Sequence, residues 1–501
     1  MQKLTILFFF VVATAICFAQ TKSQIIEGTE GARLDSLLTP YLLQLRNLTN
    51  NNAGIAVGLT KGDKIIYART FGFSNMEDSI KADFNTVFHI ASVSKPFTAA
   101  AIVKLVEQGK LNLDDFIIKF IPEFEMKDAN YKQITIKQIL THTSGIPRHV
   151  SVGDWENPVY GEKALEKNLE DIKPLMLDFV PGTDFSYSNS AFDILGIVIS
   201  RVSGMSFEEY VKTNILIPSG MTNSFYSKPQ DNLPEHWAIP YSYGIETQIW
   251  SPFPYSENYF PSSGLHTTLL DMCNWGMVYA NNGRHKDSVV IKPDYFSLLT
   301  APNFDTPWGD KIGLSWFVKD YLDRPIIMHQ GNDTGFESLM YVYLKDSVSV
   351  IVMANRDFSR TGRIINAVSE FFFEQKAKDY SVSAKFPFSI AYNERGIEYA
   401  SQLWEAWRND TTDIYQVNDE DILTTGAVLE NGGNWDAAKD VLEYYLTLDS
   451  NSTYAWRLLG NVYLNLGNKP QAKLCYEKTL LINPEYEKGL KALEELEKMK
   501  N

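Results

Sequence analysis

A serine and a lysine stand three residues apart at the start of a predicted helix, and such a pair can perform nucleophilic chemistry. Ser92 and Lys95 lie in Ser92-Val93-Ser94-Lys95, which leads directly into the apolar-periodic stretch Pro96–Gln108. Residues three apart share a helix face. A serine needs an adjacent base to attack an acyl carbon, and a desolvated lysine can be that base. About one or two Ser-x-x-Lys matches are expected by chance in a chain this long, so an N-cap serine beside a surface lysine is the alternative interpretation.

Two further motifs accompany this pair. Tyr187-Ser188-Asn189 ends the turn-rich loop 181–189, just before the predicted helix Ala191–Val202, where side chains can point into a cleft. His329-Gln330-Gly331 is the only His-x-Gly in the chain and precedes a predicted strand near Ser338. Taken alone, a histidine bonded at a strand edge beside a glycine turn is an equally good interpretation.

Read together and in this order, the three motifs resemble those of the penicillin-recognising serine hydrolases, specifically the class C β-lactamase and related esterase and D-peptidase family. The resemblance extends over roughly Leu34 to Phe373 and is specific as an ensemble. Further matching stretches are Phe88–Ser92, Ile136–Gly145, Gly264–Asp271, Gly313–Trp316 and Ala354–Arg356.

This resemblance implies a role for each motif residue. Ser92 is the expected acylated nucleophile, Lys95 and Tyr187 share proton transfer, and Asn189 positions Lys95 and the substrate amide. The backbone N–H groups of Ser92 and Asn332 form the expected oxyanion hole, and such fixed donors are worth about 3–4 kcal/mol each. The residues expected to bind substrate are His329, Gly331, Asn332 and Asn355.

The third motif departs from the β-lactamase pattern, because His329-Gln330-Gly331 replaces Lys-Thr-Gly. A lysine places a permanent positive charge near the substrate carboxylate, whereas a histidine is largely neutral near pH 7. We therefore expect inefficient penicillin hydrolysis, and a preference for carboxylate-bearing substrates that strengthens as pH falls through the titration of His329. The peptidase and esterase branches of the family tolerate histidine here.

Other chemistries lack their motifs. The sequence has no Gly-x-Ser-x-Gly elbow and no glycine-rich phosphate loop. The seven histidines show no metal-ligand spacing, so we expect no metal or cofactor, and His142 is expected to support a loop. Cys17, Cys273 and Cys475 give no disulfide or zinc pattern.

The elements that must position these residues predict an α+β domain over 29–375. Runs at Ala53–Leu59 and Lys64–Phe71 form one predicted hairpin, and runs at Ser338–Leu344 and Ser347–Met353 form another. Antiparallel pairing between these two ends would close the domain around a largely helical stretch. The fold is thus expected to be an antiparallel sheet flanked by helices plus a helical region, with the active site between them.

A different pattern begins after Phe373. We expect a linker over 376–392 and an all-α domain over 393–501 with no convincing strand. The clear unit 453–486 resembles a tetratricopeptide repeat, and 419–452 is a degenerate copy that keeps Gly426 and Ala438. The repeats should pack on each other, on the helix 393–409, or on the hydrolase domain. The signature positions of the clear unit are Trp456, Leu459, Gly460, Tyr463, Ala472, Tyr476 and Pro484.

The N-terminal sequence and the composition indicate where the protein is located and which classes of partner it can bind. Lys3 precedes the apolar stretch Leu4–Ala19, which predicts a signal peptide over 1–19 and a secreted or periplasmic protein, with a retained anchor or a lipoprotein signal as alternatives. No later apolar run is long enough to span a membrane. The net charge of −15 provides no basic footprint for nucleic acid.

These observations favour an exported serine hydrolase that acts through an acyl-enzyme on amides or esters, with D-amino-acid peptides of the cell wall as the expected substrates. A β-lactamase or a lipolytic esterase is the alternative within the same chemistry. A non-catalytic scaffold that works through its repeats is the alternative of another class. In each case the repeats are expected to hold a protein or peptide partner.

Overall fold

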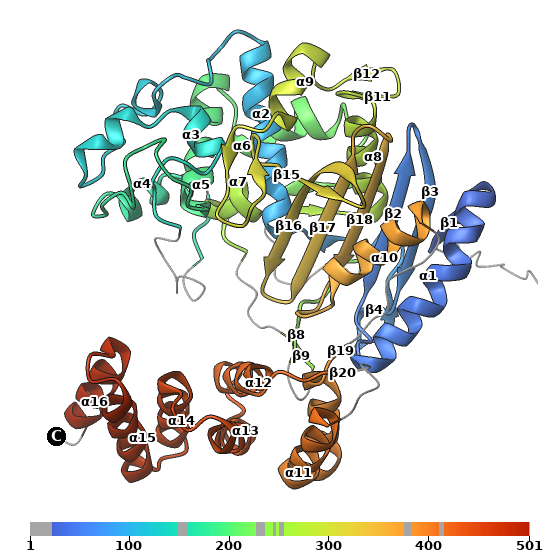
Figure 1. Ribbon diagram of the computed structural model, residues 1–501. Coiled ribbons are helices and arrows are strands. Elements are labelled where there is room, and N and C mark those ends of the chain that lie inside the picture. Colours follow the sequence, from blue (N-terminus) through green and yellow to red (C-terminus); the bar gives the residue numbers. More distant parts are fainter. Residues whose placement is uncertain are drawn as a thin grey trace, which may run out of the picture.

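The computed structural model describes residues 23–148, 158–161, 163–226, 236–243, 247–249, 255–374, 382–409 and 415–499. It has a large body of sheet and helices and a row of helices beside it, drawn in orange and red in Figure 1. The predicted class, an α+β domain followed by an all-helical region, is confirmed. The signal peptide predicted for 1–19 lies outside the described residues.

A nine-stranded antiparallel sheet forms the centre of the large body, in the order β1-β3-β2-β18-β17-β16-β15-β14-β13. Both predicted hairpins are present, as β2–β3 and β17–β18. β2 pairs with β18 from Ile55↔Ala354 to Lys61↔Val348, so the two ends of the domain close the sheet as predicted. The strands are β1 Gln24–Ile26, β2 Ile55–Lys61, β3 Lys64–Phe71, β13 Phe304–Asp305, β14 Lys311–Ile312, β15 Phe317–Tyr321, β16 Arg324–Asp333, β17 Phe336–Tyr343 and β18 Val348–Ala354.

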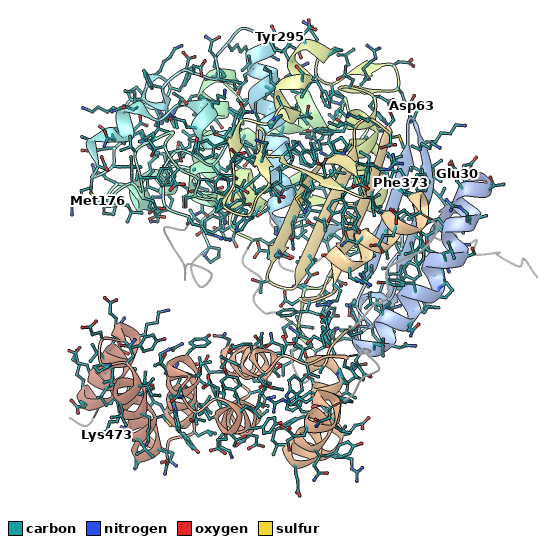
Figure 2. The ribbon with its side chains drawn as sticks, viewed as in Figure 1. Glu30, Asp63, Met176, Tyr295, Phe373 and Lys473 are labelled. Carbon is teal, nitrogen blue, oxygen red and sulfur yellow. The ribbon has the colours of Figure 1, made fainter. Side chains whose placement is uncertain are left out.

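Two hydrophobic cores cover the two faces of this sheet. One core packs α1 and α10 against the strands, and the other packs α8 against the opposite face and also contains α2 and α5. Side chains fill these layers closely in Figure 2, where the labelled Phe373 ends α10. The helices of this domain are α1 Gly28–Leu48, α2 Lys95–Glu107, α3 Ile136–Leu140, α4 Lys167–Ile172, α5 Asn189–Ser203, α6 Phe207–Val211, α7 Phe260–Ser263, α8 Leu269–Ala280, α9 Pro293–Thr300 and α10 Thr361–Phe373.

A small second sheet supports the segment that leads to the predicted nucleophile. Its order is β6-β10-β7, and the 3₁₀ turn η1 (Ala91–Ser94) follows β6 directly and runs into α2. The sheet thereby fixes the start of α2. Its strands are β6 Phe88–His89, β10 Leu265–Thr267 and β7 Phe225–Tyr226; separate two-stranded pairs are β4 Phe73–Asn75 with β5 Ile80–Lys81, β8 Tyr241–Ser242 with β9 Gln248–Ile249, and β11 Arg284–His285 with β12 Ser288–Val289.

The C-terminal helices form helical hairpins with a core of their own. Gly460 on α14 faces the ring of Tyr476 on α15, and a Cβ at residue 460 would lie 2.3 Å from that ring. Gly426 on α12 similarly faces Leu442 on α13. Both glycines therefore permit close helix packing. These helices are α12 Glu420–Asn431, α13 Trp435–Leu448, α14 Thr453–Asn465, α15 Lys469–Ile482 and α16 Glu487–Lys498.

The predicted linker is wrong over its described part. Residues 376–381 lie outside the described residues, but β19 (Val382–Ser383) and α11 (Lys385–Arg408) occupy the rest, and α11 is interrupted at Gly396, where φ is 76° and ψ is −175°. Phe386, Phe388 and Ala391 are buried, which gives this segment a reason to be helical. Pro387 lies in the first turn, where it breaks no helical hydrogen bond.

The beginning of α11 instead belongs to the hydrolase surface. The Tyr243 hydroxyl donates to the Lys385 carbonyl at 3.2 Å and lies 2.9 Å from Ser389 Oγ. Lys385 Nζ stands 3.9 Å above the ring of Phe358. Two short strands also correct the prediction: β20 (Tyr415–Gln416) pairs in parallel with β19, and β1 extends the sheet to before residue 29.

Within the described part of the chain, no single helix is both long and apolar enough to cross a membrane; only α5 and the helical segment Phe207–Leu216, bent by 76°, meet that test as a pair. Cys273 and Cys475 are buried free thiols. Cys17 lies outside the described residues.

Candidate active site

Ser92 and Lys95 lie together at the start of α2. Ala91 has φ 46°, and this left-handed residue turns the chain out of β6 into η1, with Ser92 as its second residue. Lys95 opens α2, and its Nζ lies 3.2 Å from Ser92 Oγ. The structure therefore brings the amine within hydrogen-bonding distance of the hydroxyl, as the three-residue spacing predicts.

Lys95 is fully buried and is held by two further acceptors. Its Nζ donates to Asn189 Oδ1 at 2.7 Å and to the Ser262 carbonyl at 2.9 Å. Asn189 is the first residue of α5, and the Ser188 side chain caps that helix by accepting the Ala191 N–H. The amine thus has a fixed position between α2, α5 and α7, directed at Ser92.

Tyr187 packs against both Lys95 and His142. Lys95 Nζ lies 4.9 Å from the centre of the Tyr187 ring, and the His142 ring stacks on Tyr187 with the ring centres 4.3 Å apart. His142 Nδ1 accepts the Ser188 N–H at 3.1 Å, so this histidine supports the loop as predicted. Burial, and then the charge of Lys95, hold the pKa of His142 well below its usual value, which keeps the ring neutral.

His329 lies on β16 beside this group. Its ring centre is 6.4 Å from that of Tyr187, and its Nδ1 is 2.9 Å from the Gln330 carbonyl oxygen. Burial, followed by the charge of Lys95, lowers the pKa of His329 to about 3. The expectation that His329 gains charge in mildly acidic solution is therefore wrong, because the ring stays neutral down to about pH 4.

Gly331 allows β16 to rest against the nucleophile turn. A Cβ at residue 331 would lie 2.3 Å from the Ile90 carbonyl oxygen and 3.1 Å from Ser92 N. Ser338 Oγ also donates to the Ile90 carbonyl, at 2.7 Å. Asn332 is the residue after Gly331 in β16, so its backbone lies next to the place where this strand comes closest to the turn that carries Ser92.

The Asn355 side chain is not available to bind substrate, and that prediction is corrected. Its side chain is completely buried: Oδ1 accepts the Gly54 N–H at 2.6 Å, and Nδ2 donates to the Ser74 and Ile239 carbonyls at 3.0 and 2.8 Å. The amide joins three backbone segments. The sequence Ala354-Asn355-Arg356 does not distinguish an asparagine that makes such internal bonds from one that faces a ligand, which is why the prediction failed.

Several residues of the site were not predicted from sequence. His89 Nε2 lies 3.2 Å from Asp333 Oδ2, which links the strand before Ser92 to the strand end after Asn332. Ser262 contributes its backbone carbonyl to Lys95, and no residue type signals such a role. Asp193 lies one helical turn after Asn189, and that i, i+4 spacing was the available signal.

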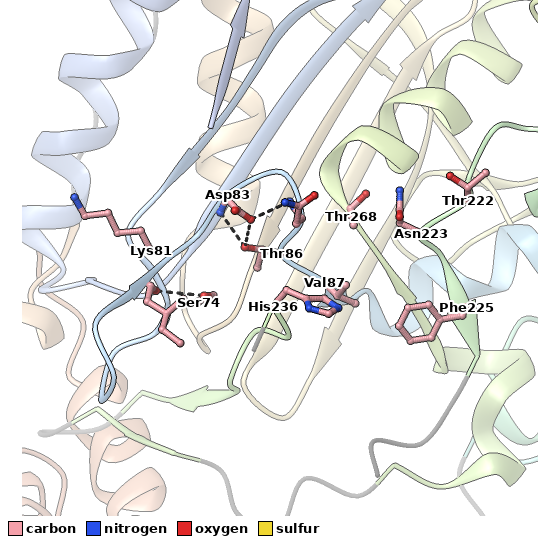
Figure 3. A pocket seen from close by; sticks show the side chains of 12 residues that line it. Ser74, Lys81, Asp83, Thr86, Val87, Thr222, Asn223, Phe225, His236 and Thr268 are labelled. Carbon is pink, nitrogen blue, oxygen red and sulfur yellow. Dashed lines mark hydrogen bonds between the residues drawn. The ribbon is translucent and has the colours of Figure 1, made fainter. Parts of the chain in front are cut away.

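Among the described residues no group of three or more His, Cys, Asp or Glu side chains could hold a metal ion. A separate cavity of about 590 Å³ adjoins the three strands of the small sheet: Val87 precedes β6, Thr268 follows β10 and Phe225 lies in β7, and all three line it together with His236 (Figure 3). None of the predicted catalytic residues lines it.

Comparison with known proteins matches two family descriptions to this chain. The family described as Beta-lactamase matches residues 42–370, and the Tetratricopeptide repeat matches residues 453–486. Protein flp of Staphylococcus aureus (strain MRSA252) is 29% identical over 309 residues, which are 60% of this chain and 59% of that protein. Penicillin-binding protein 4* of Bacillus subtilis (strain 168) is 24% identical over 63% of this chain and 71% of its own length. The chain thus spans about three fifths of the length of the flp relatives.

Solved structures share the fold. The octameric penicillin-binding protein homologue from Pyrococcus abyssi has a TM-score of 0.58 at 24% identity and covers 72% of this chain and 80% of its own. A penicillin-binding protein from Bacillus halodurans has a TM-score of 0.54 at 26% identity, over 66% and 99%. A class C β-lactamase has a TM-score of 0.57 at 19% identity, over 70% and 97%.

Proposed function

This chain belongs to the Beta-lactamase family, whose match spans residues 42–370 of 501, and from that premise we propose that it is a serine hydrolase acting through an acyl-enzyme. One observation carries the proposal. The buried Lys95 amine lies 3.2 Å from Ser92 Oγ and 2.7 Å from Asn189 Oδ1. This is the arrangement of a nucleophile, its base and the group that orients the base.

The reaction follows from these positions. Ser92 Oγ attacks the acyl carbon of an amide or ester, and its proton passes to Lys95, directly or through the Tyr187 hydroxyl. The backbone N–H groups of Ser92 and Asn332 receive the negative charge on the former carbonyl oxygen. Collapse of this intermediate breaks the bond to the leaving nitrogen or oxygen, which takes up the proton and leaves an acyl ester on Ser92.

Water completes the cycle. It attacks the ester carbon while its proton is taken by the same basic groups, and the returning proton restores the Ser92 hydroxyl. The products are the carboxylic acid and the amine or alcohol released earlier. Every proton moves between the substrate, water and the Ser92, Lys95 and Tyr187 side chains.

For substrate we propose D-amino-acid peptides related to the cell wall. Support comes from the resemblance to penicillin-binding proteins. His329 is uncharged at the position where a β-lactamase has a lysine, and a neutral site suits esters, so a lipolytic esterase is the second candidate. A β-lactamase is the less favoured alternative, because every penicillin carries a carboxylate and the cation opposite it is missing, whereas an amide bond within a longer peptide has no free carboxylate beside it.

Intact-mass measurement of the full chain after exposure to a penicillin, a p-nitrophenyl ester and a D-alanyl peptide tests the proposal. A covalent adduct on Ser92, absent from Ser92→Ala, is the expected result. The reagent that is turned over, rather than only bound, identifies the substrate class. No adduct with any reagent would favour the scaffold interpretation.

We propose further that the repeats hold a protein or peptide partner and that the protein is exported. The repeat helices α12–α16 are packed by their own clusters, which leaves their function separate from the hydrolase chemistry. Pull-down with the full chain and with a protein ending at residue 409, which removes α12–α16, tests the first point. Edman sequencing of the secreted protein tests cleavage after Ala19.

A further inference from the structure

A buried carboxyl group lies behind Lys95 and has no part in the reaction described above. Asp193 is on α5, one helical turn after Asn189, and only 1% of its surface is exposed. Burying a charge is costly unless another charge or strong hydrogen bonds compensate for it. The position therefore needs an explanation from its neighbours.

Ser262 stands between Asp193 and Lys95. Its N–H donates to Asp193 Oδ1 at 3.0 Å, and its carbonyl accepts Lys95 Nζ at 2.9 Å. Thr98 Oγ1 donates to the Pro261 carbonyl at 2.7 Å and fixes the same segment to α2. The backbone of Ser262, in α7, thus connects the two groups: its N–H donates to the carboxyl group of Asp193, and its carbonyl accepts a hydrogen bond from the catalytic amine of Lys95.

We infer that Asp193 is a positioning residue whose carboxylate is the counter-charge of Lys95, stabilising the ammonium group that forms when Lys95 accepts the proton of Ser92. The inference rests on the proposed function and adds a residue to its site. Of the other titratable groups recorded beside the amine in the described residues, His142 and His329 are kept neutral by burial, and Arg148, 5.3 Å from the centre of the Tyr187 ring, is a cation.

The electrostatics agree with this geometry. Burial raises the pKa of Asp193 to about 7, while the Ser262 hydrogen bond and the charge of Lys95 lower it. A carboxyl with this pKa is mostly protonated below pH 6 and mostly ionised above pH 8. The counter-charge is consequently present in neutral and alkaline solution and absent in acid.

Asp193→Asn keeps the shape and the Ser262 hydrogen bond but removes the charge. We expect the kcat/KM profiles of the two proteins to coincide near pH 5.5. Above neutral pH, kcat/KM of the unsubstituted protein should continue to rise after kcat/KM of the variant has levelled off. The acid limb of Asp193→Asn should therefore have an apparent pKa about one unit lower and a plateau about tenfold lower.

Two matched variants separate charge from structure. Asp271→Asn removes another buried carboxyl, which accepts the Asn223 N–H and Ser224 Oγ, away from Lys95. Thr98→Val removes the bond to Pro261 without changing charge. Both should leave the acid limb in place. An Asp193→Asn profile lowered equally at every pH would overturn the inference, and a Ser92 adduct in the unsubstituted protein would still stand as evidence for the proposed function.

A double-mutant cycle tests the coupling without turnover. At pH 8, Asp193→Asn should raise Tm more in a Lys95→Met background than in the unsubstituted one, because without Lys95 the buried carboxylate has lost its counter-charge. Equal changes in Tm would show that the two side chains do not interact and would refute the inference.

Discussion

The hydrolase domain and the C-terminal repeats bury polar groups in different ways. In the described repeat helices, 415–499, the buried polar side chains are Thr425 and Thr479, and each hydroxyl bonds to a carbonyl of its own helix. The hydrolase domain buries Lys95, Asp193 and His329 within one group. All seven histidines of the chain also precede residue 330.

This difference shows that the free-energy cost of burying charged side chains is confined, in the described residues of these two regions, to the hydrolase domain. Buried ionisable groups reduce stability unless they are compensated, and they are retained where chemistry requires a shifted pKa. The repeats have no such requirement and are built from local packing of small and aromatic residues. The two regions should therefore respond differently to substitution: the site to charge and geometry, the repeats to volume.

The largest expected effect removes the nucleophile. Ser92→Ala should abolish adduct formation and lower kcat/KM by about 10⁴-fold or more, because the other site residues act only through this hydroxyl. Ser94→Ala is the control. Ser94 Oγ accepts the Leu265 N–H at 3.0 Å, so its loss should cost about 1 kcal/mol of stability and leave the adduct intact. An adduct mapped to Ser94 would refute the assignment.

Gly331→Ala should have the next largest effect. The new Cβ would lie 2.3 Å from the Ile90 carbonyl, so β16 must move away from the nucleophile turn. A displacement of about 1 Å costs on the order of 10²-fold in rate. Gly362→Ala on α10 is the matched control, since apart from its chain neighbours and the backbone of its own helix no atom lies within 4 Å of its Cβ position. Steady-state kinetics on both proteins check this, and an active Gly331→Ala would show that the close approach is dispensable.

Features that depend on the local sequence pattern could be predicted, whereas features that depend on contacts between distant segments could not. The hairpins, α2, α5 and the repeat at 453–486 follow from spacing within short windows, and each is found within a few residues of its predicted place. Ser262 and the burial of Asn355 depend on segments that meet only in the folded chain. The start of α11 was missed because Pro387 and its polar surroundings read as a linker, whereas Tyr243 gives its apolar side chains a surface to cover.

Gly460→Ala probes the repeats. Its Cβ would lie 2.3 Å from the Tyr476 ring, and overpacking of this kind costs about 1–3 kcal/mol. We expect the repeat transition in thermal unfolding to fall while kcat/KM stays within about twofold. Leu481→Ala, at a side chain 75% exposed in the same repeat, should change neither. A parallel loss of hydrolysis would contradict the separation of the two regions.

Truncation locates the boundary between the regions. A protein ending at residue 395 keeps the contacts of Lys385 and Ser389 with Tyr243, whereas one ending at 374 removes them and exposes Phe358. We expect the shorter protein to lose about 1–2 kcal/mol, or about 2–4 °C in Tm, relative to the longer one. Equal Tm values would place the boundary before α11. Hydrolysis should persist in both.

The smallest expected effect concerns His329: the preference between an acidic and a neutral substrate should hardly change with pH. The pKa of His329 is lowered from its usual 6.5 to about 3, so the ring is neutral above about pH 4 and gains charge only below it. The ratio of kcat/KM for an acidic over a neutral substrate should therefore vary by less than about twofold between pH 5 and pH 8. His329→Lys is the control: a permanent cation facing the substrate carboxylate should raise the ratio about tenfold. A ratio that climbs as pH falls from 8 to 5 in the unsubstituted protein would mean that His329 is protonated there, and that the site is less protected from water than its buried ring indicates.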